Sequence, residues 1–283
     1  RDIHMKNLFG SKTIISTAVL LAIVASQQVS AASITFGGQA AGDGSGQTSS
    51  RISDPSHAIN NGTNGFFVET FDQATNIDGA PAGDTQYNEP GLAADSATCA
   101  VNGTGGGITV NTSASTAFGV RKGSVPNVAA QPLNDSTCYG HTPAEGGDLP
   151  SWVEIDYSGF LAAQGGDVRI DYLGFYWGSV DNYNDFEFFS GDDSVAKITG
   201  PELLALSNAA SGDQTDPDSN RYVNIDFSFA ESFDRVRVST SGIAGEFDNI
   251  VIGLNNRQVP SPAGLAFLGL GLLGLSFSRK FGK

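Results

Sequence analysis

Residues 168–198 read VRIDYLGFYWGSVDNYNDFEFFSGDDSVAKI. Residues 168–177 begin with alternating apolar and polar side chains and then become apolar, which is typical of a central strand. Two further runs, 186–189 and 194–198, are separated by Ser-Gly-Asp-Asp at 190–193, a sequence that favours a hairpin turn. This stretch therefore predicts neighbouring strands of an antiparallel sheet.

The pattern of short strands continues on both sides of this stretch. Residues 152–157 alternate, Phe233, Val236 and Val238 indicate another strand, and 247–254 indicate the last. In 222–229 one face carries Val223, Ile225, Phe227 and Phe229 and the other carries polar residues and Tyr222. Residues 201–206, with a proline first, favour a helical turn, although a further strand is the alternative. About seven strands in 150–256 predict an all-β fold, an antiparallel β-sandwich of jelly-roll-like form.

The first half of the chain is less regular. Strands are expected at 33–36, 66–71, 108–110 and 117–120. Between them lie Gly-, Ser- and Asn-rich stretches, which are either ordered loops over the sandwich or partly disordered linkers. We expect a single extracellular domain, 33–258, with an elaborated N-terminal half.

Both ends of the chain carry targeting signals. After Met5, a short basic region precedes an apolar run at 13–25 and small residues at 29–32, which together predict a signal-peptide helix in segment 1–32. In segment 259–283, residues 263–277 carry no charge and are followed by Arg279 and Lys280. A helix of that length spans about 22 Å, short of the ~30 Å hydrocarbon core, so it predicts only a transient membrane helix.

The charge and the cysteine content of the mature domain limit its binding partners and indicate its redox environment. Residues 33–258 hold nine of the 15 Lys and Arg and 29 of the 30 Asp and Glu, which leaves a net charge of −20. This charge opposes binding to nucleic acid or to anionic lipid. Cys99 and Cys138 lie in the exported part, where thiols oxidise, so we expect a disulfide between them.

The C-terminal segment resembles the PEP-CTERM sorting signal of exosortase substrates. Pro260-Ser261-Pro262 occupies the place of the family's Pro-Glu-Pro motif, with Ser261 where the family usually has Glu, and a Leu- and Gly-rich helix and a basic end follow. The resemblance implies processing by signal peptidase and an exosortase. It also implies a Gram-negative host and an inner-membrane intermediate that is released to the cell surface or extracellular matrix.

The middle of the chain is similar to one group of exosortase-dependent surface proteins. The residues that carry this similarity lie at 83–87, 172–184, 186–191 and 247–250. Members of that group have no established catalytic activity, so the resemblance implies location and fold rather than mechanism.

Two acidic clusters suggest calcium. Asp213, Asp216, Asp218 and Asn220 place four oxygen-bearing side chains within eight residues, which suits a hard cation, although a solvated turn is the alternative. A second cluster holds Asp181, Asn182, Asn184 and Asp185, and Asp248 with Asn249 could join either. Calcium is therefore the cofactor that the sequence suggests.

An aromatic run beside the second cluster invites a glycan-binding interpretation. Sugars stack on aromatic rings while Asp and Asn bind their hydroxyls, which nominates Tyr183 with Asp181, Asn184 and Asp185. Phe175 and Trp177 are expected in the core instead.

The sequence favours a non-enzymatic function. The exported part has only His57 and His141 and lacks a G-x-S-x-G motif, so a Ser-His-Asp triad is not indicated. We expect a structural or adhesive role in biofilm or exopolysaccharide. The alternatives are a calcium-dependent carbohydrate-binding module and a secreted glycan-active enzyme.

Overall fold

The computed structural model describes residues 32–53, 65–72, 99, 107–165 and 167–256. Its larger sheet is formed by β1 Ser33–Phe36, β4 Phe66–Glu69, β6 Gly119–Lys122, β7 Cys138–Thr142, β9 Val168–Gly178, β12 Arg221–Asp226 and β14 Gly245–Asn256. The strand order is β1-β12-β9-β14-β7-β6, and β4 also pairs with β14.

The smaller sheet has the order β11-β10-β13-β8-β5. Its strands are β5 Thr109–Thr112, β8 Ser151–Asp156, β10 Asn184–Ser190, β11 Asp193–Thr199 and β13 Arg235–Thr240. The remaining elements are the hairpin of β2 Gln39–Ala40 and β3 Gln47–Thr48, the helices α1 Ser158–Gln164 and α2 Gly200–Ser207, and a short 3-10 helix at Phe229–Glu231. All described strand pairs are antiparallel, which confirms the expected all-β antiparallel fold.

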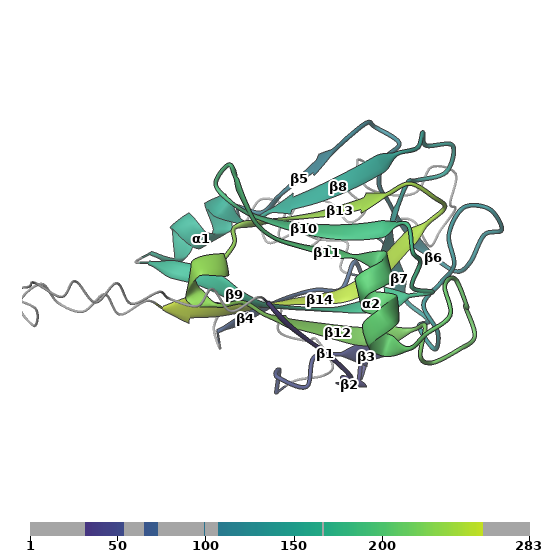
Figure 1. The fold of residues 1–283 in the computed structure, drawn as a ribbon, viewed down its shortest axis with the longest axis horizontal. Helices are drawn as coiled ribbons and strands as arrows, with labels where there is room; N and C mark the ends of the chain where they lie inside the picture. The colour runs from purple at the N-terminus through teal and green to yellow at the C-terminus, as the bar shows by residue number, and fades with distance from the viewer. Residues whose placement is uncertain (1–31, 54–64, 73–98, 100–106, 166, 257–283) are drawn as a thin grey trace, which may run out of the picture.

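The main hydrophobic core lies between the two sheets. Figure 1 shows the sheets as two layers, with α1 and α2 at opposite ends of them. Alternate residues of the facing strands fill the space between the layers, among them Val153, Ile155, Phe175, Trp177, Phe186, Phe188, Val223, Ile225, Val236, Val238, Phe247 and Ile252. The placement of Phe175 and Trp177 in the core is therefore confirmed, and the jelly-roll-like form stays a prediction.

The larger sheet is covered on its other face as well. Tyr172, Tyr176 and Tyr222 form a second cluster there with Ile52, Val68 and Val251. Tyr172 donates a hydrogen bond to Asn224 Oδ1 at 2.7 Å, and Asn224 donates to the carbonyl of Gly37 at 2.8 Å. The Gly- and Ser-rich segment around β2 and β3 is thus an ordered cover over this face.

The strand expected at 222–229 is shorter in the structure. Phe227 is buried, but Phe229 is 54% exposed and lies in the 3-10 helix, so the strand does not extend to it as expected. The strand ends at Asp226, and the amide of Ser228 then donates to Glu231 Oε2 at 3.0 Å, which holds the turn into the 3-10 helix. The helical turn expected at 201–206 is present as α2, with Thr199 and Glu202 as its capping box.

The expected disulfide is confirmed, since Cys99 and Cys138 are bonded with their Cα atoms 5.5 Å apart. The segments predicted as signal peptide and sorting helix, with Pro260, Ser261 and Pro262, lie outside the described residues. Within the ranges that are described, no helix is long and apolar enough to cross a membrane.

The described chain ends lie at one end of the sheets, and a group of loops lies at the other. Asn256, the last described residue, pairs with Val168, and Ser33 pairs with Asp226 in the same half of the larger sheet. At the opposite end, β14 begins beside the end of β9, where Glu246 pairs with Gly178. The loops 124–130, 179–183, 208–220 and 241–244 lie at this second end, which we call the loop end.

Candidate functional site

Both predicted clusters lie at the loop end and contact each other. Ser211 Oγ donates to Asp181 Oδ1 at 3.2 Å, and the amide of Gly212 donates to the carbonyl of Val180 at 2.9 Å. The amide of Val180 in turn donates to the carbonyl of Ser219 at 2.8 Å. The structure thus brings together two segments that are about thirty residues apart in the sequence.

The cluster at 213–220 uses its polar groups to hold its own loop. Asp213 Oδ1 accepts from the amides of Thr215 and Asp216, and these bonds lower its pKa. Asp216 Oδ1 accepts from the amide of Asp218 at 2.9 Å, and Asp218 forms an ion pair with Arg221 at 3.3 Å. Asp side chains that accept from main-chain amides two residues on form Asx turns, which stabilise the loop from within.

Asn220 fastens this loop to the body of the protein. Its amide group donates to the carbonyls of Asp213 and Asp216, each at 3.0 Å. Its oxygen accepts from the amides of Leu133 and Ser179 at 3.1 and 3.0 Å. Because all of these bonds are internal, Asn220 has a structural role here, and calcium at 213–220 stays a prediction.

The residues nominated for glycan binding separate into different environments. Tyr183 donates to the carbonyl of Ile243 at 2.7 Å, and its ring lies so close to Gly242 that a Cβ there would be 2.8 Å from it. Asn184 is fully buried, whereas Asp185 pairs with Lys197 at 3.0 Å on the outer face of β10. Asp181 is 6% exposed, and burial raises its pKa. Asp181 and Tyr183 interact with each other, whereas Asn184 is buried and Asp185 lies on the outer face, so only part of the nominated set lies together.

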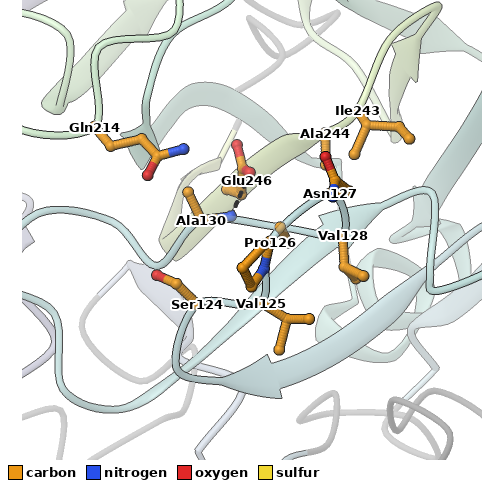
Figure 2. Close-up of a pocket in the computed structure, with 11 residues that line it drawn as sticks. Ser124, Val125, Pro126, Asn127, Val128, Ala130, Gln214, Ile243, Ala244 and Glu246 are labelled. Atoms are coloured by element: carbon orange, nitrogen blue, oxygen red, sulfur yellow. Dashed lines mark hydrogen bonds between the residues drawn. The ribbon is translucent and has the colours of Figure 1, made fainter.

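A pocket of about 530 Å³ opens at the loop end beside these residues. Figure 2 shows Gln214 on one side of it, Ile243 and Ala244 on the other, and Glu246 behind them. Segment 124–130 forms the remaining wall. The lining thus combines amide groups, one buried carboxyl and the aliphatic surfaces of Val125, Pro126, Val128 and Ile243.

Segment 124–130 has a tight turn at its centre. Pro126 and Asn127 occupy the middle positions, with the amide of Val128 donating to the carbonyl of Val125 at 3.1 Å. Asn127 has φ +61°, the left-handed conformation that the third position of a type II turn requires. Val125 and Ala129 pair on either side, so the turn presents Pro126 and Asn127 as a fixed edge of the pocket.

Glu246 is the titratable group in the pocket lining. It is 2% exposed, and its carboxyl accepts from the amide of Ala130 at 2.8 Å and from Ser179 Oγ at 3.1 Å. Burial, with a smaller contribution from Asp181, raises its pKa to about 8. Glu246 therefore anchors the pocket wall to β14 and offers a hydrogen-bonding carboxyl at its base.

Sequence reasoning did not identify this pocket. Glu246 stands next to the apolar strand that was expected at 247–254, which is the only local signal that it has a special role. Segment 124–130 and Gln214 come from two loops without a motif, so their convergence depends on tertiary structure. The arrangement can bind a polar ligand with an apolar face.

Comparison with known proteins gives little further direction. No protein-family model matches the chain, and no curated protein matches its sequence. Among solved structures, it is similar to a Stig cyclase, Fisc, from Fischerella sp. TAU, with 10% identity and a TM-score of 0.32 over 54% of this chain and 86% of that chain. That likeness carries no argument about function.

Proposed function

We propose that this chain is an exported protein of the cell surface or extracellular matrix, with a structural or adhesive role in biofilm or exopolysaccharide. Its two sheets form a jelly-roll-like sandwich, and the pocket at the loop end binds a hydroxyl-rich ligand such as a stretch of polysaccharide. Signal peptidase and an exosortase process it during export. The observation that carries the binding role is the pocket built from segment 124–130, Gln214, Ile243 and Glu246.

The chemistry of the pocket suits an uncharged sugar better than an anion. Asn127 and Gln214 supply amide donors and acceptors, while Pro126, Val128 and Ile243 supply apolar surface for the faces of sugar rings. The net charge of −15 disfavours anionic ligands. A neutral oligosaccharide is therefore the ligand class to test.

Replacing Gln214 with alanine is expected to weaken the binding of neutral oligosaccharides about two- to tenfold, because one or two hydrogen bonds are lost. Gln214 is exposed in the pocket wall, so the fold does not depend on it. Isothermal titration of the purified full chain with exopolysaccharide fragments measures the change.

Gln164 provides a matched control, because it is an exposed glutamine on α1 at the opposite end of the sheets. Gln164→Ala should bind as tightly as the unmodified chain. Equal weakening by both variants, or no saturable binding by the unmodified chain, would count against the pocket.

Export and sorting predict defined ends for the mature protein. Intact-mass measurement of the protein recovered from the cell surface or medium is expected to place its N-terminus at Ala32 or Ser33, and its C-terminus near 259–262. A host that lacks the exosortase should keep the C-terminal segment. Recovery of the full-length chain from the cytoplasm would contradict the proposal.

A calcium-dependent carbohydrate-binding module is the second candidate. It is favoured by one observation, that Gln214 of the pocket lies within the acidic loop of Asp213, Asp216, Asp218 and Asn220. In this version calcium orders the loop and thereby the pocket wall, so chelation should abolish oligosaccharide binding as well as lower stability.

A further inference from the structure

Strand β14 changes partner half-way along one of its sides. Gly245 to Phe247 pair with β7, and Ile250 to Gly253 pair with β4. Asp248 and Asn249 fall in the gap between the two partners, where the pairing with β9 is also interrupted. Asn249 has φ +48°, so the backbone itself is bent at this point.

Two further carboxyls reach the same gap from the ends of the partner strands. Asp72 follows β4 and Asp135 precedes β7. Each uses one oxygen for a main-chain amide, since Asp72 Oδ1 accepts from Cys138 at 2.7 Å and Asp135 Oδ1 accepts from Thr137 at 2.8 Å. Asp248 does the same with the amide of Asn249 at 2.6 Å.

Among the residues that the structure describes, no donor binds the second oxygen of each ionised carboxyl, which is buried. This holds for Oδ2 of Asp72, Asp135 and Asp248. Asp248 is fully buried, and Asp135 is 9% exposed. Three unsatisfied buried carboxylate oxygens are costly, because a buried acceptor without a partner loses its hydration.

Asn249 supplies an independent sign of a ligand. Its amide group donates to the carbonyls of Ser45 and Gln47 and to Ser45 Oγ, at 2.8–2.9 Å. These bonds orient the side chain and leave its Oδ1, which is also buried, without a donor. Asn249 is fully buried.

The carboxyls and Asn249 lie close together. Ser45 pairs with Asp135, and the carbonyl of Ser45 accepts from the amide group of Asn249 at 2.8 Å, which brings Asp135 and Asn249 to the same place. The carboxyls of Asp135 and Asp248 are close enough to share a hydrogen bond when one is protonated. Ionised carboxyls this close repel one another, and a cation between them would remove the repulsion.

We infer that Asp135, Asp248 and Asn249 form a buried calcium site at the break in β14, with Asp72 at its edge. Among the described residues, no three His, Cys, Asp or Glu side chains gather as a complete metal centre. The proposed site instead uses two carboxylates and the amide oxygen of Asn249, with main-chain carbonyls or water in the remaining positions. This site is separate from the loop at 213–220.

The ligand atoms of the proposed site determine which metal ion it prefers. All the side-chain donors are oxygens, which disfavours zinc, copper and iron relative to calcium and magnesium. Calcium accepts an irregular set of six to eight ligands, whereas magnesium demands near-ideal octahedral geometry. A site assembled from a strand break and two loop ends fits calcium better.

Thermal unfolding of the full chain tests this inference. With about 5 mM calcium instead of chelator, Tm is expected to rise by about 2–9 °C for a Kd of about 10⁻⁴–10⁻³ M. Asp248→Asn should abolish the rise, while Asp213→Asn, a matched change in the other acidic loop, should keep it. Magnesium at the same concentration should give a smaller rise.

Terbium luminescence gives a readout that does not depend on stability. Tyr176 lies within the field of both Asp135 and Asp248, so excitation of tyrosine should sensitise terbium bound there. We expect a signal that calcium displaces and that Asp248→Asn and Asp135→Asn lose. If Asp248→Asn does not fold, Asp135→Asn replaces it in both measurements.

Three outcomes would overturn the site. The first is no response of the unmodified chain to calcium or terbium, which would leave Asp135 and Asp248 as a proton-sharing pair. The second is a response that survives Asp248→Asn. The third is a response that Asp213→Asn alone removes, which would assign calcium to 213–220. Oligosaccharide binding is measured separately with Gln214→Ala, so the two proposals fail independently.

Discussion

Replacing Trp177 with alanine is expected to lower the free energy of unfolding by about 3–5 kcal/mol. Trp177 is 1% exposed in the core between the sheets. Its ring packs edge-on against Phe186, with the centroids 5.0 Å apart, and lies 6.0 Å from Phe175. Domains are commonly stable by only about 5–15 kcal/mol, so this loss is a large part of the total. Urea unfolding followed by circular dichroism measures it.

Trp152 is the matched control, because it is the other tryptophan of the chain and lies on the outer face of the smaller sheet. It is only half-buried, and Arg237 lies over its ring at 4.5 Å. Trp152→Ala should cost about 1 kcal/mol, mainly the cation–π contact and partial burial. Equal losses at Trp152 and Trp177 would contradict the arrangement of the core.

Replacing both Cys99 and Cys138 with alanine is expected to cost about 4 kcal/mol, with a range of about 2–5 kcal/mol. The disulfide closes a loop with a sequence separation of 39, and the unfolded chain gains the freedom of that loop when the bond is absent. Both cysteines are buried, so the folded state also loses packing. Urea unfolding of the double variant measures the cost.

Reductant provides the control for this second result. Treating the unmodified chain with reductant should reproduce the destabilisation without any change of sequence, while the double variant should not respond to it. A change below about 1 kcal/mol would show that the loop is already constrained in the unfolded state.

The second half of the fold was predictable because its strands each bury one face. Residues 222–226 show this most clearly, since Val223 and Ile225 enter the main core while Tyr222 and Asn224 face the covering segment. Strands with two such different faces produce the alternation that a sequence reveals. The turn at 190–193 was equally plain, and β10 and β11 form the expected hairpin around it.

The first half was harder to predict because many residues that its strands bury are polar or small. All five residues of β7, Cys138–Thr142, are buried, so no alternation marks the strand. The second half also held two surprises. Helix α1 has only seven residues, of which Phe160 and Leu161 are buried, too few for a helical period. Phe229 continued the strand pattern in the sequence, but the chain leaves the sheet before it, where Glu231 accepts from the amide of Ser228.

The candidate sites show the same limit. Asp248 and Asn249 were recognised in the sequence as residues whose oxygens could bind a cation. Asp72 and Asp135, which the fold brings near Asp248, flank other strands, and no local spacing in the sequence connects them to it. Likewise, only the fold brings Asp181 next to Ser211, because the hydrogen bond between them joins segments that are far apart in the sequence.

The pocket and the last described residue lie at opposite ends of one strand. β14 has twelve residues and runs from Gly245 at the pocket to Asn256 at the far end. At about 3.3 Å per residue this is roughly 40 Å, about five times the Debye length of ~8 Å at physiological ionic strength. A change of charge beside Asn256 is therefore screened before it reaches Glu246, and it should leave the electrostatics of the pocket unchanged.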